Sequence, residues 1–310
     1  MTNTFGPIGG SLTALVTPFR DTQLDTAALA SLCERQINAG TTGLVVCAST
    51  GEASCLTTAE QIRAFRTVVS AAAGRVKVIA GCTTTATATS ILLATEAVRA
   101  GADALLLAAP PYNKPTQDGV FAHVRAVAHA CRLPIILYDV PSRVGIKLAD
   151  ATIARLVEQE LIVALKDATA DLSRPPRLKA LCGAGLAQLS GEDATAAAYR
   201  AMGGDGCISV TANVAPALCA GLHAAWDSGD LAGFGYLRDL LDPLNTALLT
   251  ESNPIPVKAA LELLGLCSSA VRLPLTRASQ ATRDGLACLL PTIAVAEQRA
   301  ACTPCFALAD

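Results

Sequence analysis

One lysine stands inside a stretch that is otherwise mostly apolar. Lys166 lies in the run Ile162-Val-Ala-Leu-Lys-Asp-Ala168. Lysine is rarely buried in such a run without a partner or a function, and alternation along a strand points Leu165 and Asp167 to the opposite face. Burial disfavours the charged amine, and an uncharged amine attacks a carbonyl carbon to form a Schiff base. The sequence therefore predicts a lysine nucleophile for an oxo substrate, with a lysine paired to a neighbouring carboxylate as the structural alternative.

Other polar side chains with catalytic or binding potential follow other apolar runs. Tyr138 closes Pro134-Ile-Ile-Leu-Tyr138, one run before the lysine, where a phenol could transfer protons to and from the reacting centre. Ser49 and Thr50 could bind a carboxylate through hydroxyls and backbone N–H groups. Arg143 lies in a loop where a guanidinium could hold a carboxylate with two parallel hydrogen bonds. Taken singly, these residues also fit a core tyrosine, a turn and a surface arginine.

Metal and nucleotide chemistry find little support in the sequence. His123 and His129 are six residues apart on one predicted helix, so they do not share a face. Gly203-Gly-Asp-Gly206 precedes an apolar run and fits a turn better than a phosphate-binding loop. Cys302-Thr-Pro-Cys305 is a single pair near the carboxyl end, which is weak evidence for a metal. We therefore expect catalysis without a metal or a nucleotide cofactor.

The elements that position these residues follow from a repeated pattern. Apolar runs rich in Val, Ile and Leu alternate with Ala-rich stretches of helical spacing, as expected of parallel strands buried on both faces and joined by helices. Eight such units predict a TIM (β/α)8 barrel, in which active groups gather at the carboxyl ends of the strands. The eight runs are residues 12–19, 43–49, 77–82, 102–109, 134–140, 162–168, 186–191 and 206–211.

The remaining chain carries only helical patterns. Apolar residues at spacings of three and four occur over residues 231–241, 257–264 and 278–290. These predict a C-terminal helical extension, which divides the chain into a catalytic barrel over residues 1–228 and a helical domain over residues 229–310.

Composition limits the partners and the compartment. Among 310 residues, 24 basic and 26 acidic side chains leave a net charge of −2, too small a field to hold nucleic acid or an anionic membrane. No apolar stretch reaches the ~18 residues of a spanning helix, and the first ten residues lack an export signal. Twelve cysteines scattered through apolar segments are typical of buried reduced thiols. We expect a cytoplasmic protein.

Seven segments, in order along the chain, resemble the dihydrodipicolinate synthase family, a group of pyruvate-dependent class I aldolases. The resemblance covers nearly the whole chain. The segments are Ser49-Thr-Gly-Glu52, Pro111-Tyr-Asn-Lys-Pro115, Leu137-Tyr-Asp-Val-Pro-Ser-Arg143, Lys166-Asp-Ala-Thr169, Ser190-Gly-Glu-Asp-Ala194, Cys207-Ile-Ser-Val-Thr-Ala-Asn213 and Asn253-Pro-Ile-Pro-Val-Lys258.

The resemblance implies a proton relay around the lysine. Lys166 would form an imine with pyruvate, and Tyr138 would be the proton-transfer phenol. Thr50 would link Tyr138 to a second phenol, Tyr112, which in this family reaches into the active site of the neighbouring subunit. A homodimer, usually paired into a tetramer, is therefore implied.

The resemblance also implies how the substrates are held. Ser49 and Thr50 would bind the carboxylate of pyruvate, and Arg143 the carboxylate of aspartate semialdehyde. Gly191 and Ile208 would line the pyruvate pocket through backbone groups. The implied product is the cyclic precursor of diaminopimelate and lysine.

The chain departs from the family pattern at several positions. Ser49 replaces the usual threonine and keeps the hydroxyl. Pro111 replaces the first of two adjacent tyrosines. In lysine-inhibited members that tyrosine contributes to the feedback site, and Thr58, Gln61 and Thr89 stand at the other positions of that site here. We therefore expect weak or absent inhibition by lysine.

Two other functions stay open. One is a related aldolase or dehydratase acting on another aldehyde or sugar acid, against which the Pro-Ser-Arg segment argues. The other is a non-catalytic barrel.

Overall fold

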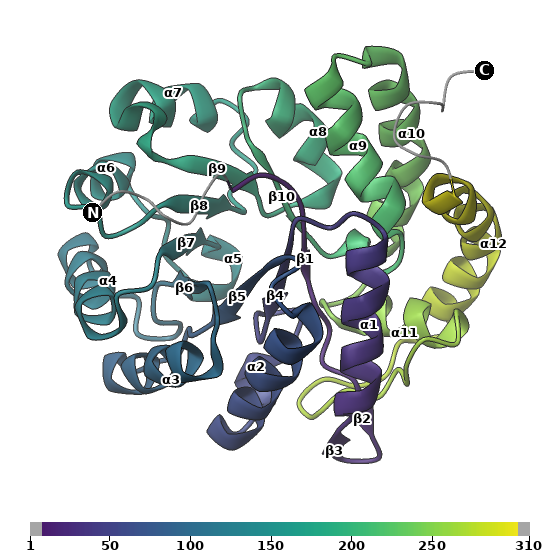
Figure 1. The fold of residues 1–310 in the computed structure, drawn as a ribbon, viewed down its shortest axis with the longest axis horizontal. Helices are drawn as coiled ribbons and strands as arrows, with labels where there is room; N and C mark the ends of the chain where they lie inside the picture. Colours follow the sequence, from purple (N-terminus) through teal and green to yellow (C-terminus); the bar gives the residue numbers. More distant parts are fainter. Residues whose placement is uncertain (1–7, 303–310) are drawn as a thin grey trace.

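The computed structural model describes residues 8–302. Within this part of the chain, eight parallel strands close into a barrel, and the barrel order follows the chain order until β10 returns to β1 (Figure 1). The predicted TIM barrel is thereby confirmed, and each strand falls in or beside its predicted run. The barrel strands are β1 (Gly10–Ala14), β4 (Gly43–Val46), β5 (Lys77–Gly81), β6 (Ala104–Ala108), β7 (Ile135–Asp139), β8 (Ala164–Asp167), β9 (Ala187–Ser190) and β10 (Gly206–Ser209).

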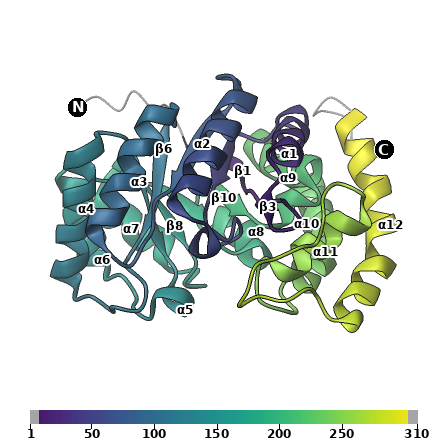
Figure 2. The same ribbon diagram turned by 90° about the horizontal axis from the view of Figure 1, so that it is seen from below.

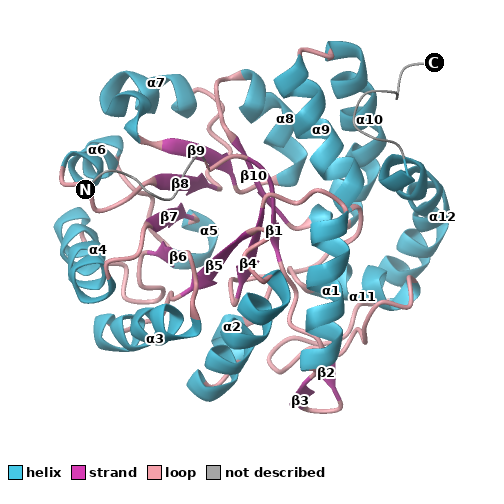
Figure 3. Ribbon diagram, in the orientation of Figure 1, coloured by secondary structure: helices cyan, strands magenta, loops and turns pink. Residues whose placement is uncertain are grey.

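Helices cover the outside of the barrel, as Figure 3 shows. The strands are therefore buried on both faces, which explains their near-continuous apolar sequence; Leu105, Leu106 and Leu107 of β6 are at most 2% exposed. The surrounding helices are α1 (Thr26–Asn38), α2 (Thr58–Ala72), α3 (Thr87–Ala100), α4 (Gln117–Cys131), α6 (Asp150–Glu158), α7 (Arg174–Cys182), α8 (Asp193–Ala201) and α9 (Pro216–Ser228). A short helix, α5 (Pro141–Val144), follows β7 and lies at one end of the barrel (Figure 2).

Polar side chains begin several of these helices. The Asp25 carboxylate accepts a hydrogen bond from the Ala28 N–H at the start of α1, and the Thr116 hydroxyl accepts one from the Gly119 N–H at the start of α4. Such caps satisfy backbone donors that have no partner within the helix. They explain why the chain leaves the strands and enters the helices where the sequence indicates.

The first apolar run divides differently from the prediction of one strand over residues 12–19. Strand β1 ends at Ala14, and the chain continues into a separate hairpin of β2 (Phe19–Arg20) and β3 (Gln23–Leu24). The strand ends because the Val16 N–H donates to the Asn213 side chain instead of to a neighbouring strand, and Pro18 has no N–H to donate. Apolar composition alone does not reveal this exit from the barrel.

Three further helices pack beside the barrel. They are α10 (Leu231–Ala247), α11 (Ile255–Leu263) and α12 (Gln280–Cys302), and Figure 2 shows α11 and α12 at the side of the molecule that carries α9. A second hydrophobic core joins these helices to α9 and includes Leu218, Leu241, Val257 and Leu290. The predicted extension is therefore helical, while the division at residue 229 stays a prediction. No described helix combines the length and the apolar composition of a membrane-spanning segment.

The cysteines comprise thiols scattered through the fold and a pair near the carboxyl end. Five free thiols are buried as predicted, and the other described free thiols are half-buried or, at Cys288, exposed. The buried ones are Cys33, Cys47, Cys82, Cys207 and Cys219. In the pair near the carboxyl end, Cys302 is the last residue of α12, and Cys305 lies outside the described residues.

Candidate active site

A cavity of about 210 Å³ opens at the carboxyl ends of the barrel strands. Six of the eight residues singled out in the sequence line it, although they come from the ends of four different strands and the segments that follow them. Arg143, expected in a loop, lies in the short helix α5. They are Ser49, Thr50, Tyr138, Arg143, Lys166 and Gly191. This end of the barrel is where the fold collects functional groups.

Lys166 and Tyr138 lie side by side on adjacent strands. They are register partners of β8 and β7, and the side-chain Nζ of Lys166 lies 4.3 Å from the centre of the Tyr138 ring. Both residues are buried, with exposures of 4% and 8%. The neighbouring Asp167 is bound to Arg174, and no ion pair is formed between Lys166 and another described residue. The geometry thus favours a lysine kept available in the cavity over one neutralised by a carboxylate.

The loop that carries Ser49 and Thr50 is held by tight backbone contacts. The Thr17 hydroxyl donates to the Gly51 carbonyl at 2.7 Å. A Cβ atom at Gly51 would lie 3.1 Å from the backbone N of Cys47, so a larger residue would fit only if the backbone moved by a few tenths of an ångström. Glycine at this position allows the close approach of the backbone.

A buried ion pair anchors the same loop to the C-terminal helices. Glu52 Oε1 lies 2.6 Å from Lys258 Nζ, and neither side chain is exposed. The second carboxylate oxygen accepts the N–H of Arg272 at 3.0 Å, and the Lys258 amine lies over the Phe19 ring. Burial lowers the pKa of Lys258 and the Glu52 charge opposes this effect. The C-terminal helices therefore fix the loop that bears Thr50.

Asn253 joins two of the predicted residues and was not assigned a role from the sequence. Its side-chain amide donates to the Thr50 hydroxyl at 3.0 Å, and its backbone carbonyl accepts a hydrogen bond from the Arg143 guanidinium at 3.1 Å. Asn253 also lines the cavity. The sequence marked Asn253 only as part of the segment Asn253-Pro-Ile-Pro-Val-Lys258. Because that segment lies far from Thr50 in the chain, the contact between the two residues could not be predicted from it.

Two acidic residues after β9 complete the cavity wall. The Asp193 carboxylate accepts the backbone N–H groups of Val210 and Thr211 at 2.8 and 3.1 Å, which fixes the turn after β10. Glu192 is half-buried in the same wall. Burial raises the pKa of Glu192, while Lys166 and Arg143 act in the opposite direction. The basic side chains of Lys166 and Arg143 and the acidic side chains of Glu192 and Asp193 thus line a single small cavity.

The other two predicted residues lie elsewhere. Ile208 is fully buried in β10, beside Leu12 of β1, and is not part of the cavity lining. Tyr112 is 90% exposed and has a left-handed backbone with φ of 70°. Within this chain, its phenol is therefore open to solvent and outside the cavity.

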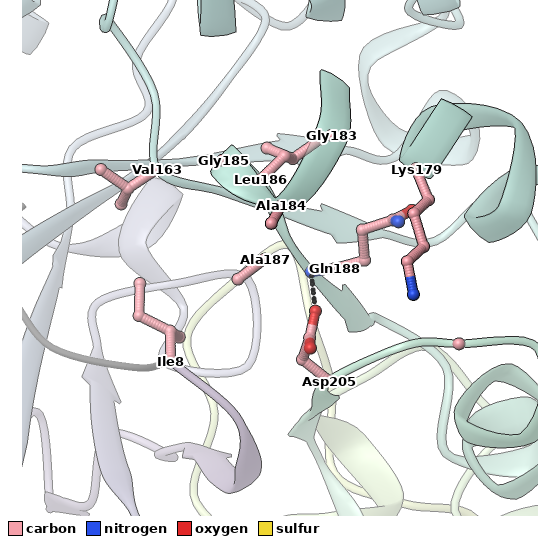
Figure 4. A pocket seen from close by; sticks show the side chains of 11 residues that line it. Ile8, Val163, Lys179, Gly183, Ala184, Gly185, Leu186, Ala187, Gln188 and Asp205 are labelled. Atoms are coloured by element: carbon pink, nitrogen blue, oxygen red, sulfur yellow. Dashed lines mark hydrogen bonds between the residues drawn. The ribbon is translucent and has the colours of Figure 1, made fainter. Parts of the chain in front are cut away.

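A second cavity of about 300 Å³ lies at the amino ends of the strands (Figure 4). Gln188 and Asp205 line it, and the Gln188 N–H donates to the Asp205 carboxylate at 2.7 Å. None of the eight predicted residues reaches this cavity. At this end of the barrel, polar contacts of this kind serve stability.

Known proteins share this architecture and much of the sequence. The family model of the dihydrodipicolinate synthetase family matches residues 7–292. The 4-hydroxy-tetrahydrodipicolinate synthase of Rhodospirillum centenum is 49% identical over 275 residues, covering 89% of this chain and 94% of that protein.

Solved structures agree with this match. The chloride-inhibited dihydrodipicolinate synthase from Acinetobacter baumannii, solved with pyruvate, is 40% identical and has a TM-score of 0.90, covering 93% of this chain and 100% of that chain. The enzyme from Cyanidioschyzon merolae, solved with lysine bound, is 34% identical with a TM-score of 0.89, covering 93% and 98%. A barrel with a buried lysine beside a tyrosine, matched along nearly its whole length, places the chain in the dihydrodipicolinate synthetase family.

Proposed function

We propose that this chain condenses pyruvate with L-aspartate 4-semialdehyde to form 4-hydroxy-tetrahydrodipicolinate, a step toward diaminopimelate and lysine. The proposal rests on one observation: the Lys166 amine lies beside the Tyr138 ring in a cavity that the Ser49 and Thr50 side chains also line. The family membership and the name of the Rhodospirillum centenum relative support the same reaction.

The reaction begins with the amine of Lys166. Its nitrogen attacks the keto carbon of pyruvate, and loss of water leaves an imine. Removal of a proton from the methyl group gives an enamine, whose carbon attacks the aldehyde carbon of the second substrate. The amino group of that substrate then attacks the imine carbon and releases the lysine, which closes the ring. Tyr138 transfers the protons, with Thr50 as the next group in the relay.

The two substrates bind at different walls of the cavity. Ser49 and Thr50 hold the carboxylate of pyruvate, and the backbone of Gly191 lines the same pocket. Ile208, which the resemblance also implied, lies outside this lining and has no part in the proposal. Arg143 holds the carboxylate of the semialdehyde, and the Glu192 carboxylate in the same cavity suits its ammonium group. The imine itself withdraws electrons from the reacting carbon, so we propose that no metal or other cofactor takes part.

A panel of aldehydes tests the substrate. With pyruvate fixed, we expect kcat/KM to be highest for aspartate semialdehyde, lower for succinate semialdehyde, which lacks the ammonium, and lowest for sugar-acid aldehydes. If a sugar-acid aldehyde were the best substrate, the related aldolase or dehydratase would be the correct function. If no aldehyde reacted while pyruvate still bound, a non-catalytic role would replace both.

We further propose that Tyr112 completes the active site of a partner subunit in a homodimer, which pairs into a tetramer. A phenol that is 90% exposed and held in a left-handed turn is available for such a contact. Neither nucleic acid nor a membrane is a proposed partner, and a cytoplasmic location stays a prediction.

Mixing two inactive variants tests the shared site. Lys166→Ala and Tyr112→Phe are each expected to be nearly inactive, because each lacks one member of every site. After co-refolding in equal amounts, one site of each mixed dimer contains both residues, so about a quarter of the wild-type activity should return. Separate refolding of the two variants followed by mixing without denaturant is the control. No recovery in mixed dimers verified by mass would place Tyr112 outside the partner's site.

Lysine is expected to inhibit the enzyme weakly or not at all. Pro111 offers no hydroxyl, and the Gln61 amide donates to the carbonyls of Ala53 and Leu56 at 3.1 and 3.4 Å, so it is already used within the chain. Initial rates with and without millimolar L-lysine, together with calorimetric titration, measure the effect. Strong inhibition would show that other residues form a feedback site.

A further inference from the structure

Each of the two central residues of the cavity is followed by an aspartate. Tyr138 precedes Asp139 on β7, and Lys166 precedes Asp167 on β8. Because successive side chains of a strand point to opposite faces, both aspartates lie on the outer side of the barrel wall. They are also register partners, as Tyr138 and Lys166 are. The reactive pair inside the barrel therefore has a carboxylate pair directly behind it.

A single buried arginine connects the two carboxylates. Arg174, the first residue of α7, has no exposed surface, and its Nη1 lies 2.7 Å from Asp139 Oδ2 and 3.3 Å from Asp167 Oδ1. Its Nε contacts Asp150 at 2.9 Å, and its Nη2 donates to the Leu148 carbonyl at 2.8 Å. All three nitrogens of the guanidinium are therefore engaged, and the group cannot turn without breaking several contacts.

The charge of Arg174 balances two buried carboxylates in the barrel wall formed by β7 and β8. Asp139 and Asp167 are 0% and 1% exposed, and two buried carboxylates on neighbouring strands repel each other. Burial raises the pKa of Asp139, and the Arg174 guanidinium opposes this effect. Removing the cation would leave charges that either take up protons or move apart, and movement apart would separate the strand ends that carry Tyr138 and Lys166.

We propose that Arg174 is a positioning residue for imine formation, which clamps the ends of β7 and β8 from outside the barrel and so fixes the Lys166 amine against the Tyr138 phenol. None of Arg174, Asp139 and Asp167 lines the cavity, so the effect passes through the strands. The inference rests on the proposed imine chemistry. A misplacement of about 1 Å at reacting groups can slow a reaction by about 10²-fold.

The test measures how fast pyruvate becomes attached to the protein. Wild type and Arg174→Met are mixed with pyruvate, quenched with borohydride at successive times and weighed by mass spectrometry. We expect trapping to be slowed by about 10²-fold in Arg174→Met. Arg174→Lys should recover part of the rate, because an ammonium neutralises the carboxylates but cannot span both of them as a guanidinium does.

A matched variant separates positioning from loss of stability. Arg200 is also a buried arginine with an aspartate partner, Asp227, and it donates to the Gly204 carbonyl, but it lies outside the cavity wall. Arg200→Met is expected to lower the melting temperature while the trapping rate stays at the wild-type value. If Arg174→Met does not fold, Asp139→Asn, which removes one of the clamped charges, is measured in its place and is expected to slow trapping.

The outcomes distinguish the inference from the proposed function. If wild type itself traps no pyruvate, the imine chemistry is wrong. If wild type traps pyruvate and folded Arg174→Met or Asp139→Asn traps it equally fast, the positioning role is wrong. An equal slowing in Arg200→Met would also overturn it, since the effect would then follow stability and not the clamp.

Discussion

Replacing Lys166 by alanine is expected to lower kcat/KM by about 10⁴-fold or more, the size of effect seen when a covalent nucleophile is removed. The amine is the group that joins the substrate to the protein, and none of the other residues that line the cavity is a lysine. The fold should survive, because alanine is small and apolar and β8 is surrounded by apolar side chains. Steady-state rates and the thermal melting temperature, measured on the same preparation, check both parts of the prediction.

Trapping with borohydride provides the direct control for this lysine. Wild type incubated with pyruvate and borohydride should gain the mass of one reduced pyruvate adduct, and peptide mapping should place it on Lys166. The alanine variant should gain none. Lys166→Arg keeps a cation but offers no reactive amine, so it should also fail to form the adduct. An adduct of wild type on a different lysine would remove the basis of the proposed mechanism.

Replacing Lys258 by methionine is expected to lower the free energy of unfolding by about 3–5 kcal/mol, the usual cost of leaving one partner of a buried ion pair alone. Glu52 would then be a carboxylate without exposed surface, holding only the Arg272 N–H. Because Glu52 adjoins the loop of Ser49 and Thr50, we also expect the KM for pyruvate to rise. Chemical denaturation and pyruvate titrations measure the two effects.

The double variant Glu52→Gln with Lys258→Met is the matched control. It removes both charges, so the unfolding free energy should recover a large part of the loss, as often happens when a buried pair is replaced together. If Lys258→Met were as stable as wild type, the pair would not anchor the loop. If the double variant were less stable than either single variant, the penalty would come from lost packing and not from an unpaired charge.

Much of the site could be predicted because its residues interrupt strong local patterns. Lys166 and Tyr138 are polar residues in runs otherwise suited to burial, and such exceptions are visible in one dimension. Their strands are adjacent along the chain and in the barrel, so their proximity followed from the fold class. Glu192 and Asp193 stand in the segment Ser190-Gly-Glu-Asp-Ala194, but the sequence did not show that the Asp193 carboxylate would also fix the turn after β10.

The sequence by itself determined the barrel, because its apolar runs and helical stretches alternate at short range and short-range periodicity is a local property of the chain. It also marked the residues at the strand ends. Only the tertiary structure decided how those residues are held. The Glu52–Lys258 pair joins positions 206 residues apart, Asn253 reaches Thr50 across 203 residues, and Arg174 meets Asp139 across 35. Contacts of this kind depend on closure of the barrel and on the helices packed against it, and no periodic pattern in the sequence encodes them.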